Sequence, residues 1–376
     1  MEVYLRELAA ALAAVGHDVR VATRFARDHP PDTATLHVGS EDPRRYSDDD
    51  VTVAVLGTAR GRGWLMRPVH RVHFHAPRLA VRFLHAALGP SLRRALLDAD
   101  VVHYSGTGRE LLGFVARREA VRLGVPFVVT PHTHEGHWGD GALDLDLYRS
   151  ADRVVALTLD ERRRLTAAGV SPTAIDVVGH GVSVAGGGDG ASFRATHGLG
   201  DAPVVLFLGR KTPDKGFDLL LESAPALWSR VPDARVVLAG TGGAPRALPP
   251  SAMDPRVLTL GRLDDAERED AYAACDVFAL PSEAEAFGLV VLEAWSYAKP
   301  VVASDIPTLR ERLARGGGIA VARNPEAMGL ALARVLADAG LRQRLGQEGQ
   351  AAARFATWER AATAMTALYE RAGAGP

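Results

Sequence analysis

The sequence has few cysteines, little net charge and no long apolar run. Its one cysteine, Cys275, rules out an internal disulfide framework and suits a reducing compartment. The formal net charge of -1 leaves the chain as a whole without the excess positive charge of a nucleic-acid-binding protein. No apolar run approaches the roughly 18 residues that a membrane-spanning helix needs. No signal peptide is visible, although a start upstream of Met1 would hide one, and we expect a cytoplasmic protein.

The composition is that of a soluble α/β protein. The 376 residues are enough for two domains, and 47% are hydrophobic and 24% charged. Short, continuously apolar runs alternate with helical patterns, which predicts parallel sheets covered by helices on both faces. The expected strands cover 19–23, 51–57, 101–105, 127–131, 154–157, 175–178, 204–209, 236–240, 257–260, 277–280, 301–304 and 318–321.

A glycine-rich stretch, 185–190 (AGGGDG), is the best candidate for a linker. It divides the chain into two similarly built halves, which predicts two Rossmann-like domains facing each other across a ligand-binding cleft. The expected parts are an N-terminal domain (1–184), a linker (185–200), a second domain (201–354) and a C-terminal helix (355–376).

The most informative segment is 281–304, PSEAEAFGLVVLEAWSYAKPVVAS. Helical spacing of apolar residues predicts a helix from Gly288, which places Glu285 in the preceding loop and Glu293 in the second helical turn. The free N–H groups near Gly288 and Leu289 form an anion site. The segment therefore offers an anion site between two carboxylates that can bind hydroxyl groups.

A second segment, VVLFLGRKTPDKGFDLLLES, combines a strand, a tight turn and a helix. Gly209 lets the backbone approach a ligand, and Arg210 and Lys215 project from the carboxyl end of the strand, where open parallel sheets bind ligands. Both cations suit phosphate oxygens. A solvated basic turn is the alternative, but the nearby glutamate pair favours a binding site.

Together these segments resemble a known family, the retaining glycosyltransferases of family 4, which have the GT-B fold. The resemblance includes the Gly-Arg…Lys-Gly turn, the Glu-x7-Glu segment with Phe-Gly-Leu, and the Pro-Val-Val-Ala-Ser strand. It extends to GRLDDAEREDAYAACDVFALPS, LAAALAAVGHDVRVAT and the closing FATWERAATAMTALYERA, and so covers nearly the whole chain. The fold class that it implies is α/β, GT-B, with two facing Rossmann-like domains built on parallel sheets. It also implies that 1–184 is the acceptor-side domain, 201–354 the nucleotide-sugar-binding domain and 355–376 the crossover helix.

The resemblance implies transfer of a sugar from a nucleotide-diphosphate sugar to an acceptor hydroxyl, with retention and without a metal or cofactor. The predicted catalytic residues are Glu285, His132, Arg210 and Lys215. The predicted donor-binding residues are Gly209, Gly240, Gly242, Arg262, Leu263, Phe287, Gly288, Leu289 and Glu293. Glu293 would bind the ribose, and Glu285 and His132 would bind the donor sugar. Arg210, Lys215 and the helix start would stabilise the departing diphosphate. The resemblance also implies front-face attack, in which the leaving phosphate accepts the acceptor's proton, so no protein base is named.

One feature departs from the family pattern. Members begin with a strand and a glycine-rich loop, whereas this chain begins MEVYLRELAAAL, within the following helix. The first strand of the N-terminal domain is therefore expected to be missing, and a truncated gene product is favoured over a natural deletion because losing a central strand is costly. Two alternatives stay open: a nucleotide-binding but inactive protein, and a GT-B sugar-nucleotide epimerase or hydrolase.

The segment 60–94 is basic and contains no Asp or Glu. Its cationic and titratable residues are Arg60, Arg62, Arg67, Arg71, Arg78, Arg82, Arg93, Arg94, His70, His73, His75 and His85. One interpretation is a surface for an anionic or lipid-linked acceptor, or for the inner face of a membrane. The other is a solvated segment that pairs with the acidic stretch 47–50.

Three further motifs imitate other sites. The string HTHEGHWGD from His132 suggests zinc, but its spacing and glycines indicate a loop without a metal site. The glycine loop AGTGGAP is an incomplete dinucleotide fingerprint, because Pro245 stands where the third glycine belongs. Asp144-Leu-Asp146 imitates a metal-binding pair, and we expect it to be a solvated helix face.

Overall fold

The computed structural model describes residues 2–25, 43–48, 50–58, 61–182, 187–242 and 249–373. They form two compact units. Unit 1 contains Met1–Gly179 and Trp358–Pro376, and unit 2 contains His180–Thr357. The C-terminal helix α14 (Trp358–Gly373) belongs to unit 1, where it packs against α1 (Glu2–Ala14), so the chain returns to its first unit at its end.

Unit 2 is built on one six-stranded sheet in which all paired strands are parallel. The strand order is β10-β9-β8-β11-β12-β13, so the earliest strand, β8, lies near the centre. The strands are β8 (Val204–Leu208), β9 (Arg235–Ala239), β10 (Val257–Leu260), β11 (Val277–Leu280), β12 (Val301–Ser304) and β13 (Gly318–Val321). Because parallel strands share their direction, all their carboxyl ends lie at one edge of the sheet.

Helices cover this sheet on both faces, as buried parallel strands require. They are α7 (Gly190–Thr196), α8 (Phe217–Trp228), α9 (Asp265–Ala274), α10 (Leu289–Ser296), α11 (Pro307–Leu313), α12 (Pro325–Ala337) and α13 (Ala339–Ala353), with short 3-10 turns at Pro213–Lys215 and Pro250–Met253. On one face α8 and α12 pack together over Phe207, Val236 and Ala279. On the other, Tyr272 of α9 and Trp295 of α10 are fully buried.

Unit 1 contains two sheets where one parallel sheet was predicted. Four parallel strands follow the order β4-β5-β6-β7, and three others the order β1-β3-β2, in which β2 is antiparallel to β3. The strands are β1 (Arg20–Thr23), β2 (Arg44–Asp48), β3 (Val51–Val55), β4 (Val102–Ser105), β5 (Phe127–Thr130), β6 (Arg153–Ala156) and β7 (Ile175–Val177). The sequence did not predict β2, because its RRYSD composition lacks an apolar run.

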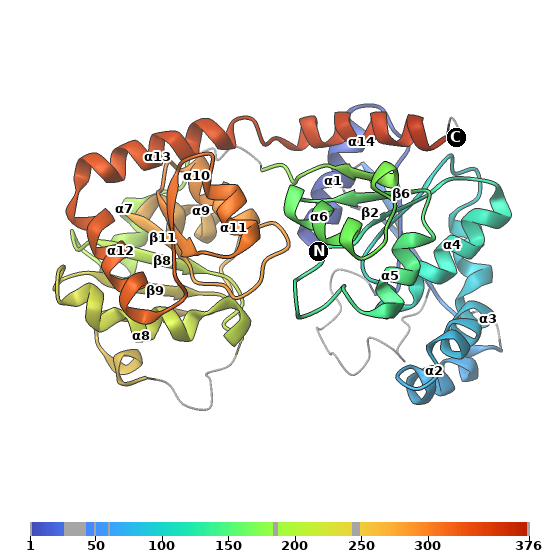
Figure 1. The fold of residues 1–376 in the computed structure, drawn as a ribbon, viewed down its shortest axis with the longest axis horizontal. Coiled ribbons are helices and arrows are strands. Elements are labelled where there is room, and N and C mark those ends of the chain that lie inside the picture. The colour runs from blue at the N-terminus through green and yellow to red at the C-terminus, as the bar shows by residue number, and fades with distance from the viewer. Residues whose placement is uncertain are drawn as a thin grey trace. The chain divides into compact units, whose positions relative to one another are not determined.

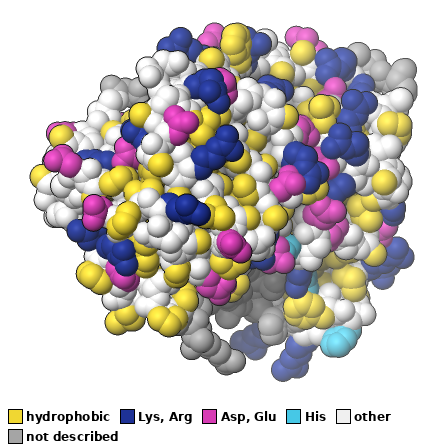
Figure 2. All heavy atoms as spheres, turned by 60° about the vertical axis from the view of Figure 1, so that its left-hand side comes forward, with side chains coloured by type: hydrophobic (Ala, Val, Ile, Leu, Met, Phe, Trp, Pro, Cys, Tyr) yellow, Lys and Arg dark blue, Asp and Glu magenta, His cyan; other side chains and the backbone are white. Residues whose placement is uncertain are grey.

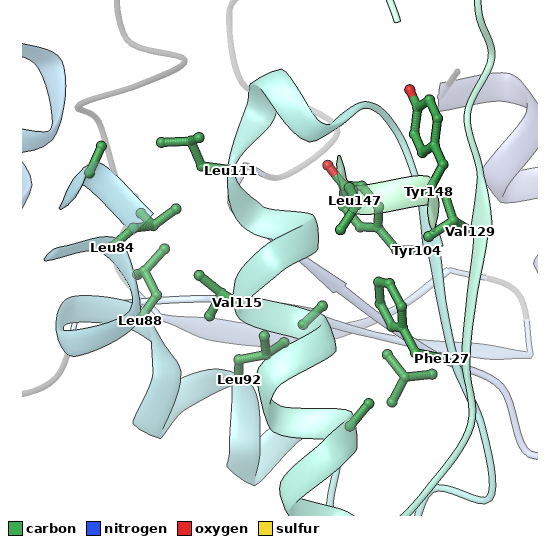
Figure 3. Packing of buried hydrophobic residues seen from close by; sticks show 14 of the residues in the cluster. Leu84, Leu88, Leu92, Tyr104, Leu111, Val115, Phe127, Val129, Leu147 and Tyr148 are labelled. Carbon is green, nitrogen blue, oxygen red and sulfur yellow. The ribbon is translucent and has the colours of Figure 1, made fainter. Parts of the chain in front are cut away.

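The core of unit 1 lies between its four-stranded sheet and the helices above it. These helices include α2 (Met66–Val72), α3 (Pro77–Ala95), α4 (Leu112–Leu123), α5 (Ala142–Arg149) and α6 (Leu159–Ala167), and 3-10 turns lie at Gly63–Leu65, Gly108–Glu110 and Pro172–Ala174. Figure 3 shows Leu84, Leu88 and Leu92 of α3 facing Val115 of α4. Their spacing of four residues gives α3 one buried stripe and leaves its opposite side exposed.

Residues 187–200, within the predicted linker 185–200, belong to unit 2. A Cβ on Gly188 would lie 2.3 Å from the backbone of Glu269, so only glycine allows this approach. Helix α7 follows, with Phe193 buried and Arg194 bound to Asp276 at 2.8 Å. Residues 183–186 of the stretch lie outside the described ranges. Glycine here serves close packing rather than flexibility.

No helix in the described ranges is both long and apolar enough to cross a bilayer. The cytoplasmic location stays a prediction.

Candidate functional site

The candidate site lies at the carboxyl edge of the sheet of unit 2, where four loops meet. The loop after β8 runs beside the loop after β9, because Gly209 N donates to Ala239 O at 3.0 Å. Gly240 has a φ of +135°, and a Cβ there would lie 1.9 Å from Gly209 O. Gly240 N in turn donates to Gly261 O at 2.9 Å. The glycine at 240 is thus required by a neighbouring backbone, independently of any ligand.

A second junction joins the loop after β8 to the loop after β11. Gly216 has a φ of +71°, and a Cβ there would lie 2.1 Å from Pro281 O. Beside it, Glu283 N donates to Asp214 O at 2.8 Å. These two contacts fix the basic turn against the loop that carries the glutamates. Sequence reasoning did not single out Gly216, although its place after Lys215 and before an apolar helix is a typical signal for a left-handed residue.

This junction brings Lys215 and Glu285 together, 70 residues apart in sequence. Lys215 Nζ lies 2.8 Å from Glu285 Oε1, and the two side chains are only 15% and 10% exposed. Ser282 Oγ donates to the same carboxylate oxygen at 2.8 Å. The pair therefore has a fixed geometry, unlike a surface ion pair between mobile side chains. Ser282, which is fully buried, was not predicted as part of the site.

Helix α10 begins directly after this loop. Gly288 lies before it with a φ of +75°, and Leu289 is its first residue. Glu293 falls in the second turn, as the spacing predicted, and its Oε2 accepts a hydrogen bond of 2.7 Å from Tyr272 OH. Burial and the neighbouring charge of Glu293 raise the pKa of Tyr272 well above its usual value, so the phenol stays a proton donor. Tyr272 thereby orients the carboxylate.

Phe287, next to Gly288, is held between a histidine and an arginine. The ring of His180 stacks on it with centroids 4.3 Å apart, and Arg312 of α11 lies 3.8 Å from its centroid. Arg312 also donates to Phe287 O at 3.4 Å, and burial lowers the pKa of Arg312 to about 10. These contacts fix the Phe-Gly-Leu turn. Neither partner was predicted from the sequence, because both are distant in the chain and lie in no motif.

The remaining predicted donor residues lie at the same edge but are less constrained. Arg210 is 54% exposed and its nearest acid is Asp214, at 3.6 Å. Gly242 has a φ of +122°, and a Cβ there would lie 2.7 Å from Lys211 O. Arg262 and Leu263 follow β10, the first exposed and the second half-buried. Arg210 has no contact with Lys215 or Glu285 among the described interactions, so it is available to a ligand separately.

His132 lies in unit 1, directly after β5, and is described within that unit. It has a φ of +54°, unusual for a residue with a side chain, and is only 6% exposed. Its Nε2 shares a hydrogen bond of 2.7 Å with Ser105 Oγ, and the ring of Tyr4 lies edge-on at 4.7 Å. Burial lowers the pKa of His132 well below its usual value, so the imidazole is neutral at pH 7.

The expectation that Asp144 lies on a solvated helix face is wrong. Asp144 is 4% exposed, and its Oδ1 accepts a hydrogen bond of 2.7 Å from Arg109 N. Its Oδ2 accepts from Gly141 N at 3.2 Å, at the start of α5, where a carboxylate is favoured. Asp146, two residues on, is 44% exposed as expected. Within the described ranges, no three His, Cys, Asp or Glu side chains converge as metal ligands would.

A hollow of about 290 Å³ lies elsewhere on unit 2, lined by Arg194, Asp201, Pro203, Asp276, Leu336 and Arg342. Pro203 and Asp276 directly precede β8 and β11, so this hollow lies at the amino ends of the strands. Its central pair, Arg194 and Asp276, is engaged in structure, because Asp276 also accepts from Val204 N at 2.8 Å. The hollow contains none of the predicted site residues, and ligands in such sheets bind at the opposite edge.

Two family models match the chain, one for each unit. Residues 1–181 match the glycosyl transferase 4-like domain, and residues 202–338 match the glycosyl transferases group 1. The chain is 32% identical to the D-inositol 3-phosphate glycosyltransferase of Frankia alni over 94% of this chain and 90% of that protein. It is also 32% identical to the D-inositol 3-phosphate glycosyltransferase of Kineococcus radiotolerans, over 99% of this chain and 90% of that protein.

Solved structures share the fold. Sucrose-phosphate synthase from Thermosynechococcus elongatus matches with a TM-score of 0.76 and 21% identity, over 100% of this chain and 94% of that one. HepE of Anabaena, in complex with UDP and glucose, matches with a TM-score of 0.70 and 19% identity, over 96% of this chain and 95% of that one. With two α/β units, a parallel sheet in each, and relatives that span almost its whole length, the chain belongs to the family 4 (group 1) glycosyltransferases and has the GT-B fold.

Proposed function

We propose that this glycosyltransferase moves a hexosyl group from a nucleotide-diphosphate sugar to an acceptor hydroxyl, with retention of configuration and without a metal ion or cofactor. The observation that carries the proposal is the Lys215–Glu285 pair, fixed at 2.8 Å beside the start of α10. A cation, a helix start and a carboxylate within one loop junction suit a diphosphate joined to a sugar. The complexes of HepE with UDP-glucose and with UDP support the same donor class.

In the proposed reaction, the acceptor hydroxyl oxygen bonds to the anomeric carbon while the bond between that carbon and a phosphate oxygen breaks. Negative charge grows on the departing diphosphate, whose phosphate oxygen takes up the proton of the acceptor hydroxyl. Lys215 and the N–H groups at the start of α10 stabilise that charge, and Arg210 closes over it from the exposed turn. A diphosphate competes with Glu285 for Lys215, which frees carboxylate oxygens for hydroxyl groups of the donor sugar. Cationic side chains thus take the place that a divalent metal occupies in other phosphate sites.

Glu293 binds the ribose hydroxyls in this proposal, because Tyr272 orients its carboxylate through Oε2. The backbone at Phe287–Leu289 contacts the sugar and phosphates, and Gly209, Gly240 and Gly242 line the same edge. Arg262 and Leu263 lie beside the base. His132 contributes from unit 1 as a neutral imidazole, which can share a hydrogen bond with a sugar hydroxyl without adding charge.

The test is a transfer assay with UDP-, GDP-, ADP- and dTDP-hexoses and a set of hydroxyl acceptors. D-inositol 3-phosphate is included because the relatives carry its name. We expect a glycoside with the donor's anomeric configuration by proton NMR, formed equally with and without EDTA. An inverted product would contradict retention, and loss of activity in EDTA would contradict metal independence. Release of free sugar or an epimerised nucleotide sugar, with no glycoside, would contradict transfer.

A further inference from the structure

The surface of α2 and the start of α3 combines exposed arginines with exposed aromatic rings. Figure 1 shows the two helices side by side at the edge of unit 1, and they pack against each other. Arg62, Arg67, Arg71, Arg78 and Arg82 are exposed, and Trp64 and Phe74 are 62% and 63% exposed. Arg60 lies outside the described residues. We call the set from Arg62 to Arg82 the arginine surface.

Most cations of this surface have no ion pair with the residues that the structure describes. Arg67, Arg71 and Arg82 form no ion pair with any acid of the described ranges, and Arg62 only donates to Ala86 O at 3.2 Å. Arg78 lies 3.5 Å from Asp146, at the border of the surface. The predicted pairing with the acidic stretch 47–50 does not occur for these residues within the described ion pairs. Among the described residues, the charges of Arg67, Arg71 and Arg82 are therefore not compensated by ion pairs.

The other end of the same basic segment behaves differently. Arg93 Nε and His85 Nε2 lie 2.7 and 2.6 Å from the carboxylate of Glu119, which is fully buried, and Arg122 lies at 2.9 Å. These residues hold α3 against α4. Structural pairing therefore accounts for His85 and Arg93 in the C-terminal half of the segment and leaves Arg67, Arg71 and Arg82 without an ion pair in the described ranges.

The arrangement favours a broad anionic partner over a small anion. Arg67 and Arg71 lie four residues apart on α2, and Arg78 and Arg82 four apart on α3, so each pair forms an exposed stripe along its helix. Their opposite sides, including Met66, Val69 and Leu84, are buried in the core. A phosphate site needs donors that converge on one point, whereas these are spread along two helices. By contrast, the face in Figure 2 shows basic and acidic side chains interspersed.

We propose that the arginine surface binds the headgroup region of anionic lipid bilayers. The arginines meet the lipid phosphates, and Trp64 and Phe74 insert their rings at the interface, where aromatic side chains are favoured. Two signals, charge and apolar area, are needed for stable peripheral attachment. The arginine surface has both, because Trp64 lies in the 3-10 turn before α2 and Phe74 in the connection between α2 and α3. This binding site is separate from the donor site in unit 2.

The test uses the full chain with vesicles of phosphatidylcholine alone, and of phosphatidylcholine with 30% phosphatidylglycerol, in a sedimentation assay. We expect binding to the anionic vesicles only, weakened by added salt. Arg67→Gln with Arg71→Gln should lower the affinity about twenty-five-fold, since each arginine near a charged surface contributes about five-fold. The matched control is Arg118→Gln with Arg162→Gln, which removes two exposed arginines of α4 and α6 and should leave binding unchanged.

Removing the rings separates insertion from simple charge attraction. Trp64→Ser with Phe74→Ser should reduce the binding that persists at high salt, because only apolar contact resists screening. Absence of binding to the anionic vesicles, or equal losses in the Arg118/Arg162 control, would overturn the proposal. A fragment of double-stranded DNA serves as the competing polyanion. Binding to the DNA but not to vesicles, with the same dependence on Arg67 and Arg71, would assign the surface to nucleic acid and overturn the proposal as well.

Discussion

The two basic regions of the molecule use their cations in opposite ways. In unit 2, Lys215 is 15% exposed and fixed against Glu285 by two loops that meet at Gly216. In unit 1, the arginines at 67, 71 and 82 are exposed and lack ion-pair partners in the described ranges. The region with more cations, the arginine surface, is thus the one whose cations are less fixed by contacts within the protein. Loop packing, rather than the number of cations, distinguishes a site that can orient a reacting group from a surface that attracts a partner.

The largest expected difference between the regions concerns turnover. Lys215→Met should lower the rate of sugar transfer about 10²- to 10³-fold, as loss of one preorganised donor to developing charge does elsewhere. Arg67→Gln with Arg71→Gln should leave transfer to a soluble acceptor unchanged, although it removes more charge. Rates are measured in the NMR transfer assay. Equal losses in both variants would show that net charge, and not the fixed position of Lys215, supports the reaction.

The loop junction itself can be tested through stability. Gly216 and Gly198 both have positive φ, +71° and +62°, but a Cβ at 216 would meet Pro281 O at 2.1 Å, whereas one at 198 would meet nothing within 4 Å. Gly198→Ala should therefore lower the free energy of unfolding by about 1 kcal/mol, from the strain of the left-handed backbone alone. Gly216→Ala should lower the free energy of unfolding by about 3 kcal/mol, because the clash with Pro281 O adds to the backbone strain. Urea unfolding measures both, and equal costs would contradict the close approach of the two loops.

The same distinction between buried and exposed groups predicts a pH dependence in unit 1. Burial lowers the pKa of His103 to about 4, and its two nitrogens contact Tyr369 OH and Thr130 Oγ1, both at 2.7 Å. In the unfolded chain His103 takes up a proton near pH 6.5, whereas in the folded chain it does so only near pH 4. The folded state is therefore destabilised relative to the unfolded state as the pH falls from 6.5 toward 4.

The loss attributable to His103 is about 3 kcal/mol, from the difference between a pKa of 6.5 in the unfolded chain and about 4 in the folded one. His103→Gln should flatten the dependence of the unfolding free energy on pH between 6.5 and 4. The exposed His75 provides the control, since His75→Gln should leave the curve unchanged. A wild-type stability that stays constant over this range would contradict the buried, neutral state of His103.

Much of the fold could be predicted from the sequence, because buried parallel strands are continuous apolar runs. The strands predicted at 204–209 and 277–280, for example, coincide with β8 and β11 to within a residue. Strand β2 could not be predicted, since it is polar and pairs only at the margin of its sheet. The close packing at Gly188 could not be predicted, because a glycine cluster serves equally for flexibility and for close packing, and only the neighbouring Glu269 backbone distinguishes them.

The candidate site was predictable where its residues lie in one motif. Glu285, Gly288 and Glu293 take the places that the helical spacing indicated. Two contacts of this motif, Tyr272 with Glu293 and Arg312 with Phe287, were not predictable, because Tyr272 and Arg312 come from separate helices and their contacts depend on tertiary packing. The ion pair of Lys215 with Glu285 lies between these cases: both residues were singled out, but their direct contact was not.

The most direct test of the central claim is the affinity for nucleotides, measured by titration calorimetry. Wild type should bind the nucleoside diphosphate of its donor more tightly than the corresponding monophosphate. Lys215→Met should lower the diphosphate affinity about 10- to 100-fold, as loss of a hydrogen bond between charged groups does, and should change monophosphate affinity less. If Lys215→Met bound the diphosphate as wild type does, the junction of the two loops would not be the diphosphate site.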